Sequence, residues 1–132
     1  MNTKFVTNLK NSIKLHELGI TLHSIFFTDS TKSKEDDIER WGNNQSLYCH
    51  DNINRYLADE LGELLPSYLL IEGEIWLMRI IKNPDEWGIY YENDKHAGYI
   101  GTEGGGCIFN ESLANAIAEM VYYLVTNNLI KI

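Results

Sequence analysis

The segment from residue 68 to residue 82 is the part of this sequence that most constrains its fold. Two runs rich in β-branched and aromatic residues, Tyr68–Ile71 and Glu74–Lys82, are separated only by Glu72 and Gly73. A two-residue link that contains glycine is typical of a tight hairpin, because glycine adopts the positive φ that such turns need. We therefore expect an antiparallel pair of strands here, and the fold must contain an antiparallel sheet.

The chain after this hairpin continues as a meander. A turn around Pro84 predicts a third strand over residues 87–91, in which successive side chains point to opposite faces. A further turn at residues 93–94 precedes a short strand near residues 98–101. The sequence thus predicts an antiparallel sheet of three or four strands.

The C-terminal segment carries the clearest helical pattern. Asn110 is a suitable N-cap, Glu111 places a negative charge in the first turn, and Asn127-Asn128 end the run. One face of this helix is apolar, at Leu113, Ile117, Met120, Val121 and Leu124. We expect the helix to pack across one face of the sheet, which makes the fold class α+β.

A second helix is predicted over residues 53–65. Apolar residues recur there at helical spacing, Asp51 or Asn52 would cap the start, and Pro66 ends the run. We expect this helix to lie beside the C-terminal one.

The first fifty residues form an N-terminal helix and strand arm in this interpretation. Apolar residues from Phe5 onward predict a helix that ends at Gly19, and residues 20–27 predict a strand. A polar stretch follows and is typical of an exposed loop. We therefore divide the chain into an arm, residues 1–50, and a core domain, residues 51–132.

The charge is acidic and unevenly distributed. The chain has 11 basic and 19 acidic residues, a formal net charge of −8. Residues 1–34 carry a net charge of +3 and residues 35–132 a net charge of −11. A protein that binds a nucleic-acid backbone needs a basic face to release counterions. We therefore expect a basic protein partner and no direct binding of nucleic acid by the core domain; for the basic arm, direct contact with an anion stays open.

The sequence also bears on compartment. No stretch reaches the ~20 apolar residues that cross a bilayer, and the N-terminus lacks the apolar run of a signal peptide. Two cysteines, Cys49 and Cys107, do not make a disulfide framework. We expect a cytoplasmic protein without membrane contact, with both thiols reduced.

Patterns for catalysis and metal binding are weak. Four histidines and two cysteines are scattered without the spacing of a zinc site. Cys49 could act with His50 or His96 only if the fold brought them together, and no nucleophile, base and orienting group can be named. We expect a protein that is not an enzyme and holds no metal or cofactor.

A glycine-rich segment at residues 101–106 lies just before the C-terminal helix. Glycines before a helix N-terminus can hold a phosphate on free N–H groups, which gives an alternative anion or nucleotide site at Gly104, Gly105, Gly106 and Asn110. The phosphate-loop lysine is absent, and nearby glutamates add negative charge. An ordinary loop is the other interpretation.

Aromatic residues gather in the C-terminal half among acidic ones. Exposed tyrosine and tryptophan beside carboxylates form a composition typical of a protein-binding surface, and a role in the core is the alternative. The candidate partner-binding residues are Glu72, Glu74, Asp85, Glu86, Trp87, Tyr90, Glu92 and Asp94.

Four short motifs lie in order along the second half of the chain. They are LGELLP at 61–66, WGIYYE at 87–92, ESLANAIAEM at 111–120 and NLI at 128–130. In this order they resemble a set of small proteins carried by bacterial phages and prophages, over roughly residues 55–132. That family has no assigned activity, so the resemblance implies no catalytic residue. It does imply a mobile genetic element in a bacterial host cell.

These observations lead to one expected function and two alternatives. The first is a non-enzymatic acidic binding protein of a phage or mobile element. It would inhibit a basic host nuclease or other defence effector, as an anti-CRISPR or similar counter-defence factor does. The second is a protein that sequesters a nucleotide signal at the glycine-rich segment. The third is an immunity protein that neutralises a toxin.

Overall fold

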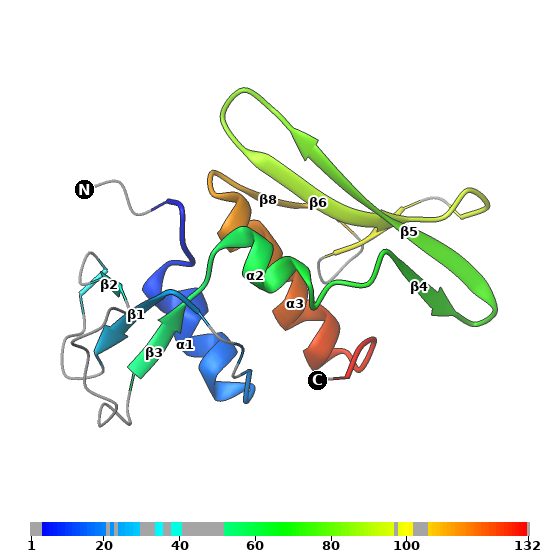
Figure 1. Cartoon of the computed structure of the whole chain (residues 1–132). Coiled ribbons are helices and arrows are strands. Elements are labelled where there is room, and N and C mark those ends of the chain that lie inside the picture. The colour runs from blue at the N-terminus through cyan, green and yellow to red at the C-terminus, as the bar shows by residue number, and fades with distance from the viewer. Residues whose placement is uncertain are drawn as a thin grey trace.

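The structure, a computed structural model, describes residues 4–20, 22, 24–29, 34–35, 38–40, 52–96, 98–101 and 106–131. Helices and two antiparallel sheets make up these residues, which confirms the expected α+β fold class (Figure 1). The elements in chain order are α1 (Leu9–Glu17), β1 (Phe26–Asp29), β2 (Glu39–Arg40), β3 (Asn52–Arg55), α2 (Ala58–Gly62), β4 (Tyr68–Ile71), β5 (Glu74–Lys82), β6 (Trp87–Glu92), β7 (Tyr99–Ile100), β8 (Ile108–Asn110) and α3 (Leu113–Thr126).

The larger sheet has five strands. Their order is β4-β5-β6-β7, and β8 pairs with the edge of β6 that also holds β7. A smaller sheet has the order β2-β1-β3. The prediction of three or four strands missed β8, because three residues directly after a glycine-rich segment are too few to show alternation. The smaller sheet was not predicted either.

The hairpin that constrains the fold forms as predicted. Strands β4 and β5 have the expected bounds, and Ile71 is opposite Glu74. Glu72 has φ 51° and Gly73 has φ 81°, so both turn residues are left-handed. Two left-handed residues form the type I′ turn, whose twist matches that of the flanking strands.

Helix α3 confirms the apolar stripe but begins later than expected. Of the stripe, Ile117, Met120, Val121 and Leu124 are buried. The N-cap is Ser112, whose Oγ accepts a hydrogen bond from the Asn115 N–H at 3.2 Å. The prediction of Asn110 as N-cap was wrong, because Asn110 is opposite Trp87 in the larger sheet.

The predicted helix over residues 53–65 was wrong in its first half. Residues 52–55 form β3, which pairs with β1, and α2 covers only Ala58–Gly62. The N-cap of α2 is Leu57, whose N–H donates to Glu60 Oε1 at 2.7 Å. Pairing with a strand about 25 residues earlier outweighs the local helical spacing, which is a weak preference.

The N-terminal helix is shorter than predicted. Phe5 lies outside it, and α1 starts after Asn8, whose Oδ1 accepts a hydrogen bond from the Asn11 N–H at 2.7 Å. Gly19 follows the helix with φ 83°, which supports its expected role at the helix end. The strand predicted over 20–27 begins only at residue 26.

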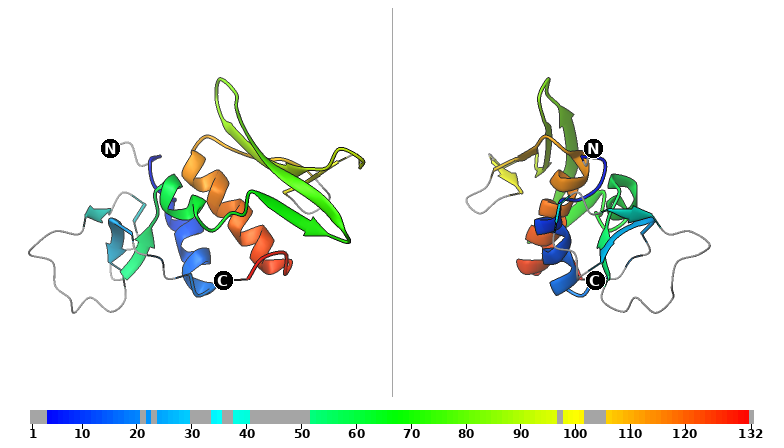
Figure 2. Two further views of the ribbon diagram at one scale, coloured as in Figure 1. Left: turned by 45° about the vertical axis from the view of Figure 1, so that its right-hand side comes forward. Right: turned by 90° about the vertical axis from the view of Figure 1, so that its left-hand side faces the viewer.

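The layers of the fold contain elements from both sides of residue 50. Helix α3 lies against the inner side of the larger sheet, α1 packs beside α3, and the smaller sheet lies beyond α1 (Figures 1 and 2). Because β1 pairs with β3 and α1 packs on α3, strand pairing and helix packing join the segments 1–50 and 51–132. The core lies between α3 and the larger sheet, with Leu61 of α2 also buried in it.

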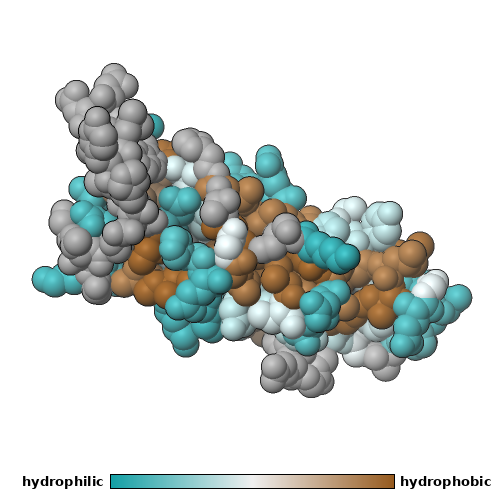
Figure 3. Space-filling model, turned by 90° about the horizontal axis from the view of Figure 1, so that it is seen from below, coloured by the Kyte–Doolittle hydropathy of each residue, from teal (hydrophilic) through white to brown (hydrophobic). Residues whose placement is uncertain are grey.

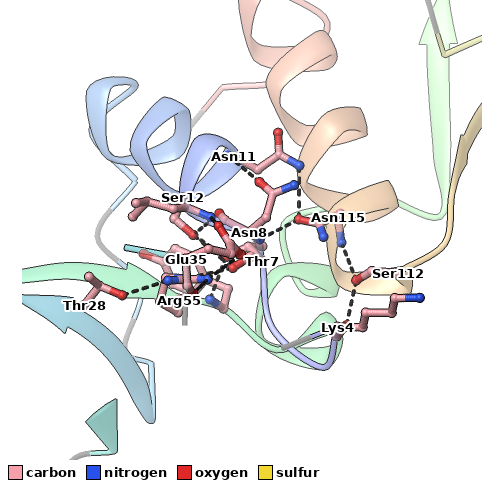
Figure 4. A network of polar contacts seen from close by, with 12 residues as sticks. Lys4, Thr7, Asn8, Asn11, Ser12, Thr28, Glu35, Arg55, Ser112 and Asn115 are labelled. Atoms are coloured by element: carbon pink, nitrogen blue, oxygen red, sulfur yellow. Dashed lines mark hydrogen bonds and ion pairs between the residues drawn. The ribbon is translucent and has the colours of Figure 1, made fainter. Parts of the chain in front are cut away.

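A buried arginine ties the N-terminal segment to the smaller sheet (Figure 4). The Arg55 side chain has no exposed surface. Its Nε donates to the Thr7 carbonyl at 2.8 Å, and its Nη1 donates to Thr28 Oγ1 at 2.8 Å. Its Nη2 donates to the carbonyl and to Oε1 of Glu35, at 3.0 and 2.8 Å. Burial lowers the pKa of the Arg55 guanidinium, and the carboxylate of Glu35 offsets part of that change.

A second polar cluster joins α1 to α3. Asn115 Oδ1 accepts hydrogen bonds from the Asn8 N–H at 2.7 Å and from Asn11 Nδ2 at 3.1 Å. The Ser112 hydroxyl donates to the Lys4 carbonyl at 2.7 Å. These contacts hold the start of the chain against the start of α3 (Figure 4).

Gly101 marks a close approach between the β7 side of the sheet and α3. A Cβ at this position would lie 2.6 Å from the Gly106 carbonyl oxygen and 3.2 Å from Met120 Cε. Since the first of these atoms belongs to the backbone, we expect Gly101→Ala to lower the free energy of unfolding by about 1–3 kcal/mol. Urea denaturation measures this loss. The control is Gly62→Ala, whose Cβ would meet no atom within 4 Å and which should not destabilise the protein.

No helix among the described residues is both long enough and apolar enough to cross a membrane.

Candidate protein-docking surface

The larger sheet has one face packed on α3 and one face turned away from it. In an antiparallel pair, residues directly opposite each other place their side chains on the same face. The register therefore defines an outer face, whose members are Tyr68, Leu70, Ile75, Leu77, Arg79, Ile81, Gly88, Tyr90, Glu92, Tyr99 and Phe109. The opposite face carries Leu69, Ile89, Tyr91 and Ile108, all of them buried in the core.

The outer face is rich in exposed hydrophobic side chains. Seven large ones are between 37% and 67% exposed: Tyr68, Leu70, Ile75, Leu77, Ile81, Tyr99 and Phe109. Together they expose roughly 700 Å² of surface, at about 200 Å² for a whole side chain of this size. The largest apolar patch on a typical monomer is about 300–600 Å² and is often functional. A patch of this size makes the outer face the candidate interaction surface of this protein.

Aromatic rings extend this face over β6, β7 and β8. Tyr90 and Tyr99 lie with their ring centroids 4.4 Å apart. Gly88 leaves room between Ile81 and Phe109, because a Cβ there would approach side-chain atoms of both residues within 3 Å. The glycine thus lets these two side chains approach each other across β6, close to the β5–β6 connection.

The acidic candidates lie at the two ends of the sheet. Glu72 lies in the β4–β5 turn and Glu74 directly follows it. Glu92 and Asp94 come to the same end because Glu92 is opposite Leu77. We call this set the Glu72 end.

The remaining acidic candidates, Asp85 and Glu86, lie in the β5–β6 connection, and we call this pair the Asp85 end. A nine-residue strand separates the ends, which corresponds to about 25 Å. The structure therefore does not bring the acidic candidates into one cluster; it places them at either end of the larger sheet. Of the two that lie in strands, Glu92 is on the outer face, whereas Glu74, opposite Ile71, is on the inner side by register.

The two aromatic candidates lie on opposite faces. Tyr90 belongs to the outer face, opposite Arg79. Trp87 is opposite Lys82, on the inner side by register, and Lys82 Nζ lies 5.2 Å from the centre of the Trp87 ring. Of the two, only Tyr90 is on the exposed apolar surface.

Basic side chains neutralise part of the acidic charge. Arg79 Nε is 2.7 Å from Glu92 Oε1, and Lys95 Nζ is 4.0 Å from Glu74 Oε2. Residues 68–101 nevertheless contain six acidic and only three basic residues. An open hollow of about 490 Å³ at the Glu72 end is lined by acidic, basic and apolar side chains together.

The glycine-rich alternative gains no support from the described residues. Gly104 and Gly105 lie outside them. Asn110 Nδ2 donates to Glu119 Oε2 at 3.1 Å, and Asn110 Oδ1 accepts from the Ser112 N–H at 2.9 Å, so both groups of this side chain are engaged. The nearby carboxylate of Glu111 would repel a phosphate.

Catalytic candidates are not assembled in the described part of the chain. No group of three histidine, cysteine or acidic side chains there is placed to hold a metal ion. Cys49 and His50 lie outside the described residues. Burial raises the pKa of the Cys107 thiol, which disfavours the reactive thiolate.

A half-buried carboxylate on α3 gives a testable pH dependence. Burial raises the pKa of Glu119, and the hydrogen bond from Asn110 offsets part of this change. The folded state therefore binds the proton more tightly than the unfolded chain, so this group lowers stability as the pH rises above its ordinary value of 4.5. We expect Glu119→Gln to raise the melting temperature at pH 7 and to leave it unchanged at pH 3.5.

Glu111 provides the control, because its pKa is shifted in the opposite direction from that of Glu119. Its hydrogen bond with Lys4 lowers the pKa of this exposed carboxyl. Glu111→Gln should therefore not raise the melting temperature at pH 7. An equal rise in both variants would mean that the total negative charge, rather than burial of Glu119, sets the effect.

The sequence predicted the acidic residues and Tyr90 but missed the aliphatic members of the outer face. The missed signal is that β5 has apolar residues on both of its faces. Ile75, Leu77 and Ile81 lie on one face, and Trp76 and Met78 lie on the other. A strand with two apolar faces is typical of one that is covered on both sides.

Comparison with known proteins adds no relative. No family model, no curated protein and no solved structure matches this chain.

Proposed function

We propose that this protein acts by binding a basic protein partner on the outer face of its larger sheet. The observation that carries the proposal is the exposed apolar surface of this face, bounded by the acidic Glu72 and Asp85 ends. An apolar centre with a polar rim is the usual anatomy of a protein–protein interface.

The negative charge of the sheet region and of the whole chain favours a basic partner. The sheet region has a twofold excess of acidic over basic residues, and the whole chain has a net charge of −8. Such a surface speeds association with a basic protein and disfavours an acidic one. Two copies of this face packed on each other would bring like charges together at both ends. A basic partner therefore fits the face better than a second copy does.

The biological role that we propose is inhibition. An acidic protein that covers a basic groove keeps nucleic acid out of it, since both compete for the same positive charges. The candidate partner is a basic nuclease or other defence effector of a bacterial host, and the protein would be a counter-defence factor of a mobile element. A toxin is the other basic partner that the same logic allows, which would make the protein an immunity protein.

The experiment is capture of host proteins on the tagged full chain, with a matched pair of charge variants. Leu77 lies on the outer face and is 43% exposed, whereas Ile80 lies on the opposite face of the same strand and is 42% exposed. We expect the wild type to capture a basic protein and Leu77→Lys to weaken its binding about tenfold or more. Ile80→Lys should bind like the wild type.

A salt series tests the electrostatic part. The affinity for the captured protein should fall as sodium chloride rises from about 0.05 M to about 0.5 M, because salt screens charges farther apart than a Debye length. The proposal is wrong if Leu77→Lys and Ile80→Lys bind equally well. An affinity that salt leaves unchanged would refute charge mimicry.

A further inference from the structure

Among the described residues, strand β4 pairs only with β5, on one of its two edges. It is the first strand of the order β4-β5-β6-β7, so β5 covers only one of its edges. Ile71 flanks the two-residue turn opposite Glu74, and the Met78 N–H donates to the Ser67 carbonyl at 3.0 Å. In an antiparallel pair the backbone groups of alternate residues face the partner strand. Ser67, Leu69 and Ile71 therefore face β5.

The N–H and C=O groups of Tyr68 and Leu70 consequently point away from the sheet. No hydrogen bond of these groups joins them to any described residue. Their side chains are among the most exposed of the outer face, Tyr68 at 54% and Leu70 at 67%. Figure 3 shows hydrophobic surface toward this end of the molecule, where β4 lies.

This edge lacks the usual protection against pairing. Exposed edge strands usually carry a charged side chain, a bulge or an internal proline. Residues 66–71 contain no charged side chain, and Pro66 lies before the strand rather than in it. The register with β5 runs from Tyr68 to Ile71 without a bulge. The edge is therefore open to another strand.

We propose that β4 pairs with β4 of a second copy of this chain, antiparallel across a twofold axis at Leu69. In that register Tyr68 of each copy lies opposite Leu70 of the other, so all the outward N–H and C=O groups of both residues find partners. Each Tyr68 ring then packs beside the Leu70 side chain of the other copy on the outer face, a favourable aromatic–aliphatic pair.

Charge permits this pairing although the chain is acidic. The nearest carboxylate after the strand is Glu72, and antiparallel pairing puts the two Glu72 side chains at opposite ends of the new ladder. Because β4 itself carries no charge and Glu72 lies beyond one end of it, two antiparallel copies of β4 can pair without bringing carboxylates together. The pairing joins the outer faces of the two copies into one surface. It requires no basic partner, so it is independent of the proposed function.

Sedimentation velocity of the full chain tests the pairing. An edge contact buries little area, so we expect a weak dimer whose mass rises from 15.2 kDa toward twice that value between about 10 µM and about 1 mM. Leu70→Pro removes an N–H that does not bond β5, and it should stay a monomer throughout. Leu70→Val keeps the N–H and should dimerise like the wild type.

Cysteine cross-linking tests the register. Tyr68 and Leu70 of different copies would be a hydrogen-bonded pair with Cα atoms about 5.5 Å apart, which suits a disulfide. Under mild oxidation, a mixture of Tyr68→Cys and Leu70→Cys should form several-fold more dimer than either variant alone or the wild type. A wild type that remains monomeric at every concentration, or a Leu70→Pro variant that dimerises equally well, would overturn the proposal. A mixture that forms no more dimer than the Tyr68→Cys or Leu70→Cys variant alone would overturn the register.

Discussion

Replacing Arg55 with alanine should lower the free energy of unfolding by about 3–5 kcal/mol, the largest loss that we expect from one substitution in this protein. The fully buried guanidinium is the shared donor for Thr7, Thr28 and Glu35. Without it, the buried Thr7 carbonyl keeps the longer 3.3 Å bond from the Ser12 hydroxyl but loses the one from Arg55, and the Thr28 hydroxyl also loses its bond from Arg55. A cavity also opens between β3 and the N-terminal segment. Urea denaturation followed by circular dichroism measures the loss.

Glu35→Gln is the matched control for this network. The Glu35 side chain is half exposed, so water can replace its contacts, and the amide oxygen can still accept from Arg55. We expect a loss of about 1 kcal/mol. If Arg55→Ala does not fold, Arg55→Lys keeps the charge but loses part of the hydrogen bonding, and it should lose about 2 kcal/mol. Equal, small losses in Arg55 and Glu35 variants would show that the network does not hold the N-terminal segment.

Asn115→Leu is the substitution with the next largest expected effect, about 2–4 kcal/mol. The two side chains have the same branched arrangement of four heavy atoms, but leucine is larger and cannot accept the hydrogen bonds from the Asn8 N–H and from Asn11 Nδ2. Both donors lie at the contact of α1 with α3, where an unsatisfied polar group costs about 1–3 kcal/mol. Thermal and urea unfolding should both report the loss.

Asn11→Ala separates the two contacts. It removes only the side-chain donor, and Asn115 Oδ1 keeps the 2.7 Å bond from the Asn8 N–H. We therefore expect less than half the loss of Asn115→Leu. A larger loss for Asn11→Ala would mean that packing of Asn11 on its own helix, and not the bridge to α3, determines stability here.

Local patterns explain which elements the sequence predicted. The β4–β5 hairpin depends on the turn at Glu72 and Gly73, which are adjacent in the chain, and α3 depends on a stripe within fourteen residues. Strand β3 instead depends on β1, which lies about 25 residues earlier. A local window cannot show such a partner, so the apolar spacing after Ile53 predicts a helix instead.

The candidate site was predictable only in part for a similar reason. Residue type alone identifies the acidic side chains and Tyr90. Which face of β5 remains exposed depends on which face α3 covers, and Ile75 and Trp76 are equally apolar in sequence. The structure therefore adds the apolar centre of the surface, whereas the sequence supplied its acidic ends.

Methyl cross-saturation by NMR tests the central claim most directly. The protein, labelled at isoleucine and leucine methyl groups, is mixed with the basic protein captured by the wild-type chain. The account predicts that saturation passes from that protein to Ile75, Leu77 and Ile81, and not to Ile80 or to Ile13, which is exposed on α1. Saturation at Ile13 with Ile75, Leu77 and Ile81 unaffected would contradict a docking surface on the outer face.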